Sequence, residues 1–184
     1  MRFLLQNARL AFGSGLYHNR PMPGDKNSQG AYNAKALIAP DHPQVAQLEA
    51  AILAVAREAW GVKAETILKG AKAAARTCLH NGDTKPNWTG FEGNYFVSMR
   101  SKIKPTVFDR DKTEVSEESG IVYSGCYGNF SMDIFAYDKP QYGISAQIRG
   151  FHKTADGDAF GGGTRAGADD FPDAGDQGPV DPLS

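Results

Sequence analysis

The chain has 184 residues of ordinary globular composition, with 20 Lys and Arg against 21 Asp and Glu, and no apolar run of the roughly 18 residues that a membrane helix needs. Residues 1–154 carry a net charge of +5, whereas residues 155–184 hold seven Asp and one Arg, a net of −6. No membrane span is expected. A signal peptide is not expected either, because polar residues interrupt the first apolar stretch, so the sequence predicts a cytoplasmic protein.

Two strands separated by a long loop are predicted at the start of the chain. Residues 2–12 place Leu4, Leu10 and Phe12 on one side of the first strand. The loop over 13–30 is dense in Gly, Pro, Asn and Ser, which are typical of turns. The second strand covers 31–39, where small and apolar residues alternate with Asn33 and Lys35.

Two helices follow. Asp41 is a candidate N-cap, and apolar residues then recur at helical spacing as far as Trp60, with Gly61 as the stop. A second, Ala-rich helix is predicted over 63–76, and three of its basic residues fall on roughly one face: Lys69, Lys72 and Arg76. Such a face is most simply solvated.

Three further strands are predicted in the second half, over residues 95–104, 121–138 and 144–153. Gly125 and Gly128 indicate a bulge or bend, as a closed barrel needs. The order of elements predicts a mainly β fold with inserted helices. We expect an OB-like five-stranded barrel over residues 1–154, followed by a disordered acidic tail over 155–184.

Each of these three strands has one apolar face, and its other face carries aromatic, small polar and cationic side chains. Unpaired bases stack on aromatic rings, for about 1–3 kcal/mol each, while cations follow the phosphates. The pattern therefore favours single-stranded nucleic acid over duplex, which offers no free base faces. The alternative is that the outward aromatics pack beneath the helices or loops. The candidate binding residues are Phe96, Arg100, Lys102, Lys104, Tyr123, Tyr127, Arg149, Phe151 and Lys153.

Trp88 and Phe91 lie in a Gly-, Pro- and Asn-rich loop over 80–93, close to Lys85. Loop aromatics beside a cation could clamp a base, or they could close one end of the barrel. We interpret Phe91 as such a plug and include Trp88 among the candidate binding residues, with both of its roles left open.

The sequence indicates no catalytic residues, metal site or cofactor. The GGG at 161–163 lacks the Lys-Ser/Thr of a phosphate loop, and Asp109 and Asp111 have no third well-spaced carboxylate. Cys78 and Cys126 are far apart and form no metal or redox motif. We therefore expect a protein that is not an enzyme.

Several segments resemble one family: the single-stranded DNA-binding proteins encoded by tailed phages and prophages. The segments are GFEGNYFVSMRS (90–101), KIKPTVFDRD (102–111), VYSGCYGNFSMDIFAYD (122–138) and YGISAQIRG (142–150), and the likeness spans roughly residues 2–153. The resemblance implies an OB-fold barrel that coats single-stranded DNA, without marked sequence preference, during phage replication or recombination in the host cell. It also implies no enzymatic activity.

The acidic tail has two candidate roles. It could compete with DNA for the basic body, or it could recruit phage or host replication and recombination proteins, as the acidic ends of similar proteins do. Phe171, however, is followed by thirteen residues, whereas the docking aromatic of those tails stands at the end. A simple solubility tail is a third reading.

A rival hypothesis makes the chain a non-catalytic protein-interaction or virion-associated structural module whose basic face meets an acidic protein. The sequence leaves open whether the protein forms a homo-oligomer.

Overall fold

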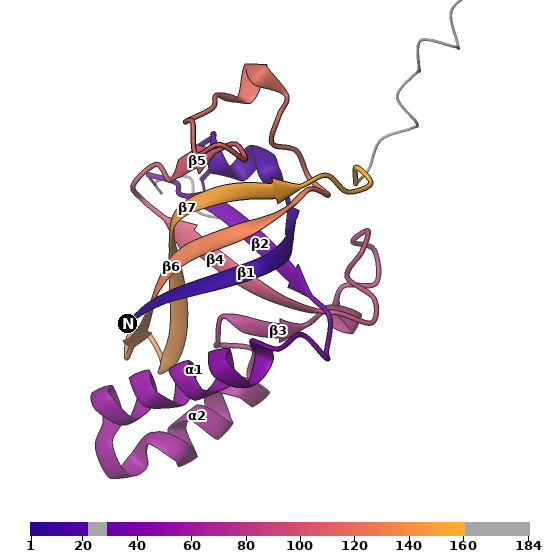
Figure 1. Cartoon of the computed structure of the whole chain (residues 1–184). Coiled ribbons are helices and arrows are strands. Elements are labelled where there is room, and N and C mark those ends of the chain that lie inside the picture. The colour runs from indigo at the N-terminus through magenta and orange to yellow at the C-terminus, as the bar shows by residue number, and fades with distance from the viewer. Residues whose placement is uncertain (22–28, 161–184) are drawn as a thin grey trace, which may run out of the picture.

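A computed structural model describes residues 1–21 and 29–160 of the chain (Figure 1). In this part the strands are β1 (Arg2–Ala11), β2 (Tyr32–Ile38), β3 (Leu79–Asn81), β4 (Tyr95–Ser101), β5 (Thr106–Phe108), β6 (Tyr127–Tyr137) and β7 (Gly143–Ala155). The helices are α1 (Val45–Trp60) and α2 (Ala64–Ala73), with short 3-10 turns at Gly13–Leu16, Gly61–Lys63, Gly82–Thr84 and Glu117–Ser119. The predicted mainly β fold with inserted helices is confirmed. Neither helix in this part has both the length and the apolar character that crossing a membrane requires.

Five of the strands pair in a closed circuit. β1 pairs antiparallel with both β2 and β6, β2 pairs with β4, and β6 pairs with β7. The circuit closes where β4 and β7 meet in parallel, with Arg100 opposite Gln147. β3 lies beside the first half of β4, and β5 adds to β7. Closure pairs edges that an open sheet would expose.

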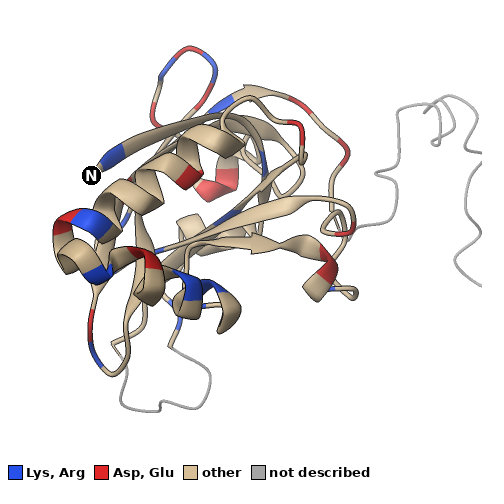
Figure 2. Cartoon of the chain, turned by 90° about the horizontal axis from the view of Figure 1, so that it is seen from below, with Lys and Arg blue, Asp and Glu red and all other residues tan. Residues whose placement is uncertain are grey.

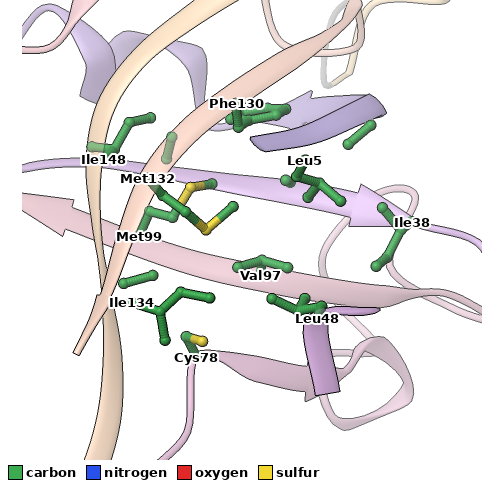
Figure 3. Close-up of a cluster of buried hydrophobic side chains, with 14 of the residues drawn as sticks. Leu5, Ile38, Leu48, Cys78, Val97, Met99, Phe130, Met132, Ile134 and Ile148 are labelled. Atoms are coloured by element: carbon green, nitrogen blue, oxygen red, sulfur yellow. The ribbon is translucent and has the colours of Figure 1, made fainter. Parts of the chain in front are cut away.

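The core fills the inside of this circuit. Figure 3 shows side chains of β1, β4, β6 and β7 pointing toward one another, among them Leu5, Val97, Met99 and Met132, all of which are fully buried. Burying each such side chain contributes about 1.5–3 kcal/mol. Leu48 of α1 joins them, so the α1–α2 hairpin seals one end of the circuit, below the strands in Figure 1.

The first helix begins later than predicted. Asp41 does not cap it; α1 starts at Val45, after Gln44. The Gln44 side chain accepts a hydrogen bond from the Gln6 backbone at 2.7 Å and donates one to the Leu4 carbonyl at 2.9 Å. Gln44 therefore ties the start of the hairpin to β1.

A bulge in β1 reverses the alternation expected there. Pairing with β6 shifts between Leu5 and Ala8, because β1 contains one extra residue at that point. Leu5 and Ala8 consequently face the core, whereas Leu4 is 50% exposed. The predicted shared side of Leu4 and Leu10 is therefore wrong, since an inserted residue turns one part of the strand over.

The first residues after β7 pack against β1 and the segment before β6. The backbone N–H of Phe160 donates to the Ser124 carbonyl at 2.9 Å, and Arg9 donates to the Asp158 carbonyl at 2.6 Å. Gly125, with φ +111°, lies so close to that carbonyl that a Cβ would collide with it. Residues 156–160 thus form a stem that contacts Arg9, Ser124 and Gly125, and the tail boundary at 155 stays a prediction. The rest of the tail, 161–184, lies outside the described residues.

Candidate nucleic-acid interface

An aromatic cluster covers the outer side of β2 and β4, opposite the core. Phe91 and Phe96 are buried in it, Trp88 is half-buried, and Phe12 is 41% exposed. The ring of Trp88 lies 5.0 Å from the rings of both Phe12 and Phe91, edge-on to each, which is a favoured aromatic geometry. We call this cluster, with Lys35, the aromatic face. Phe12 and Trp88 are its solvent-accessible rings.

Lys35 on β2 points its ammonium into the aromatic face. Its Nζ lies 5.5 Å from the centre of the Trp88 ring and donates to Ser98 Oγ at 3.2 Å. Within residues 1–21 and 29–160 no carboxylate lies at ion-pair distance from it. Burial lowers the pKa of Lys35, and the neighbouring charges of Lys85 and Arg100 lower it further. A half-buried cation without a counter-ion is suited to bind an anion.

A groove of about 840 Å³ crosses the outer side of β5, β6 and β7. Its apolar wall includes Phe108 and the side chains of Leu4 and Ile103, the last of which is 72% exposed. Basic residues line it as well, and none of its described lining residues is Asp or Glu: Lys104, Lys112 and Arg149, with His152. Apolar walls with basic residues and no acids suit a polyanion that has apolar faces.

Arg149 shares a carboxylate at the edge of this groove. Its Nη1 lies 2.8 Å from Asp133, which also accepts from Arg2 at 3.3 Å. Desolvation would raise the pKa of Asp133, but the hydrogen bonds from Arg149 and Arg2 outweigh it and lower that pKa. With one carboxylate between two guanidinium groups, the cluster keeps a net positive charge.

The end of β4 connects the aromatic face to the groove. Arg100 lies on the outer side of β4, next to β7, and the exposed Lys102 and Lys104 follow the end of the strand. Figure 2 shows Lys and Arg on both helices and strands, so positive charge is not confined to one element. Arg100, Lys102 and Lys104, which the sequence predicts to bind phosphates, thus follow one another along the segment that leads from the aromatic face to the groove.

The structure gathers the predicted residues into three places. Phe96 and Arg100 lie on the outer side of β4, as the alternation predicts, and Trp88 lies over that side from the loop between β3 and β4. Phe96 is buried beneath this loop. It therefore supports the aromatic face and offers no open ring. Lys104 and Arg149 line the groove, and the exposed Lys102 lies two residues before Lys104 without lining it. Tyr123, Tyr127 and Lys153 lie at the tail stem.

Phe151 and Lys153 do not face outward, so their predicted orientation is wrong. Gly150 pairs with Ser131 and Ile148 with Met132, which leaves Arg149 as an extra residue that turns the rest of β7 over. Phe151 is 1% exposed and packs on Phe130 with ring centres 4.8 Å apart.

Lys153 is 7% exposed and is used within the fold. Its ammonium donates to the Ile121 carbonyl at 2.7 Å, pairs with Asp156 at 2.6 Å and lies 4.9 Å from the centre of the Tyr123 ring. A lysine held by these three partners anchors the tail stem and is not available to a phosphate.

The two tyrosines near the stem differ in accessibility. The Tyr123 hydroxyl donates to Asp156 at 3.0 Å, which fixes the ring against the stem. Tyr127 is exposed, with the Arg9 guanidinium 5.6 Å from its ring centre. Of the pair, Tyr127 alone presents an open ring.

Phe12, Lys35 and His80 belong to this surface but were not among the binding residues predicted from the sequence. Alternation did place Lys35 on a polar side of its strand, but its neighbours Trp88 and Phe96 come from other segments. His80 stacks on Phe96 with ring centres 4.8 Å apart. In residues 1–21 and 29–160, His, Cys, Asp and Glu side chains form no group of three that could hold a metal ion.

Comparison with known proteins adds independent information. A family model described as Enterobacter phage Enc34, ssDNA-binding protein, matches residues 1–180. Protein p50 of Acyrthosiphon pisum secondary endosymbiont phage 1 is 36% identical over 178 residues, or 94% of each chain. The fold is similar to that of a C-terminally truncated single-stranded DNA-binding protein from bacteriophage Enc34, with a TM-score of 0.68 and 18% identity, covering 86% of this chain and 88% of that one. The same phage protein in complex with ssDNA gives a TM-score of 0.63 at 18% identity over 87% and 89%.

Proposed function

The chain belongs to the single-stranded DNA-binding protein family of Enterobacter phage Enc34, and on this premise we propose that it binds single-stranded DNA without marked sequence preference. The family resemblance expected from the sequence is confirmed, and the family is not enzymatic. The observation that carries the proposal is the pair of accessible rings, Phe12 and Trp88, beside the unneutralised Lys35.

The proposal includes an OB-like barrel as the scaffold. Its support is the closed circuit of β1, β2, β4, β7 and β6. OB-folds bind oligonucleotides on the face of their second and third strands. In this circuit those strands are β2 and β4, which carry the aromatic face.

The proposed path of the strand begins on the aromatic face, where bases stack on Phe12 and Trp88. It continues past Arg100, Lys102 and Lys104, which hold phosphates, into the groove beside Arg149. Tyr127 is a further candidate ring near the stem. Stacking on aromatic rings tolerates any base, because every base has a π-face, and this accounts for the lack of sequence preference.

The biological role we propose is the coating of single-stranded DNA during phage replication or recombination in the host cytoplasm. The acidic tail acts there by competing for the basic surface, or by recruiting replication and recombination proteins. Support for competition is its charge: residues 155–184 carry −6 against +5 in the rest of the chain.

The experiment is a fluorescence-anisotropy titration of the full chain with a labelled oligo-dT of about 30 nucleotides, longer than one OB-fold site of roughly 4–16. The matching duplex serves as competitor. Tight binding that duplex does not displace is expected. Equal displacement by duplex would indicate a generic basic protein, and no binding at low salt would favour the rival protein-interaction module.

A further inference from the structure

A cavity of about 670 Å³ lies between the α1–α2 hairpin and strands β3 and β4, next to the aromatic face. Its volume falls within the range of small-ligand pockets, about 300–1,000 Å³. Lys35 comes from β2, Lys72 from α2 and Lys85 from the loop after β3, while Trp88 and His80 supply ring surface. The hairpin therefore helps to build a site that reaches the proposed DNA-binding surface.

The charges in the cavity are unbalanced. Its lining contains three lysines and one carboxylate, Glu49, which lies 3.7 Å from Lys72. Burial lowers the pKa of His80, and the positive charges of Lys35 and Lys85 lower it further. The cavity therefore disfavours an additional positive charge on the imidazole. Concentrating like charges in a partly desolvated space is unfavourable unless an anion enters it.

We propose that this cavity receives one nucleotide of the bound strand, with its phosphate between Lys35 and Lys72 and its base against Trp88. The inference rests on the proposed single-stranded DNA binding and assigns the hairpin a part in it. A nucleotide fits both features of the cavity, because it combines an anion with a flat apolar ring, whereas an acidic side chain would use the lysines and leave the rings uncovered.

The position of Lys72 makes a matched test available. Lys69 is one turn earlier on the same helix and is also exposed, but it does not line the cavity. Lys72→Gln and Lys69→Gln remove the same charge from neighbouring surface positions. Oligo-dT affinity is measured for both full-length variants as a function of salt. A phosphate contact contributes about 0.7 to the salt slope on single strands.

We expect Lys72→Gln to weaken oligo-dT binding severalfold and to lower the salt slope by about 0.7, with Lys69→Gln close to wild type. Glu49→Gln should act in the opposite direction and tighten binding, because it frees Lys72 from its carboxylate. Glu58→Gln, on an exposed position of α1 outside the cavity, is the control for that change.

The outcomes separate the two proposals. If the wild-type chain binds no oligo-dT, the proposed function itself fails. If the wild type binds and the Lys72 and Lys69 variants behave alike, or Glu49→Gln weakens binding, only the nucleotide cavity is overturned. Thermal unfolding of each variant verifies that the hairpin is intact, and both lysines are exposed enough for the fold to tolerate glutamine.

Discussion

The ammonium group of Lys35 lies 5.5 Å from the centre of the Trp88 ring. A cation over an aromatic ring is attracted by about 0.5–2 kcal/mol, depending on desolvation. Since Lys35 belongs to β2 and Trp88 to the loop between β3 and β4, this contact fastens the loop to the sheet. Trp88 is thus presented to solvent as a ring of fixed orientation, next to a positive charge.

Replacing Trp88 tests the stacking surface directly. We expect Trp88→Ala to weaken oligo-dT binding about 5- to 150-fold, because one stacked base contributes roughly 1–3 kcal/mol. Anisotropy titration measures the change. The other tryptophan, Trp60, is the last residue of α1 and packs edge-on against Tyr142. It lies outside the proposed path of the DNA and serves as the control.

Two single-tryptophan variants supply an independent readout of the same prediction. Trp60→Phe leaves only Trp88, and its fluorescence should be quenched by oligo-dT. Trp88→Phe leaves only Trp60, and its fluorescence should change little. Quenching of equal size in both variants would contradict a stacking role specific to Trp88.

The basic residues after β4 should act through phosphates. Lys102→Gln and Lys104→Gln are each expected to lower the slope of log affinity against log salt by about 0.7, without altering preference among oligo-dT, oligo-dA and oligo-dC. Lys63→Gln, at an exposed lysine of the hairpin outside the proposed path, is the control. Slopes that match wild type in both the Lys102 and the Lys104 variant would remove this segment from the path.

Deleting residues 161–184 tests competition by the tail while keeping the stem of residues 156–160, which packs on β1 and the segment before β6. These residues carry a net charge of −4, so their removal should tighten oligo-dT binding at low salt, with the gain fading near 0.15 M, where the Debye length is about 8 Å. Replacing the five Asp of this segment by Asn should reproduce the effect in a chain of full length. Unchanged affinity of both variants at low salt would exclude competition.

His80 should make stability sensitive to acid. Burial, together with Lys35 and Lys85, lowers the pKa of His80 below its ordinary 6.5. The unfolded chain therefore binds a proton more readily, so the stabilisation is complete above pH 6.5 and is lost as pH falls through the folded-state pKa. The free energy of unfolding, measured with urea at about pH 7.5 and about pH 5.5, should fall less between these two pH values for His80→Gln than for wild type. His152→Gln is the control, and an unaltered loss in His80→Gln would refute the prediction.

Periodicity in the sequence predicted the long elements and missed the short ones. α1, α2 and the five strands of the circuit each extend over enough residues to show a 3.6- or 2-residue pattern. β3 and β5 have three residues each, too few for a pattern, and are specified by their neighbours β4 and β7. The bulge at Arg149 was also invisible, because a single inserted residue leaves the composition of the strand unchanged.

The candidate site was predicted in part for a related reason. Alternation shows that Phe96 and Arg100 point away from the core, but not what covers them. Phe96 lies beneath the Trp88 loop, and Lys35 enters the site through neighbours distant in sequence. Such coverage depends on how loops fold back over a sheet, which local pattern does not encode.

The circuit of strands sets an order for folding during synthesis. Arg2 in β1 lies opposite Asp133 in β6, so β1 is synthesised long before the strand with which it pairs along this edge. β2 becomes available much earlier and pairs with the other edge of β1. Until β6 emerges, the nascent chain exposes one unpaired edge of β1, and closure waits for the translation of nearly the whole described chain. Distant pairing of this kind slows folding, whereas the early pairing of β1 with β2 leaves one strand edge fewer unpaired while the chain is incomplete.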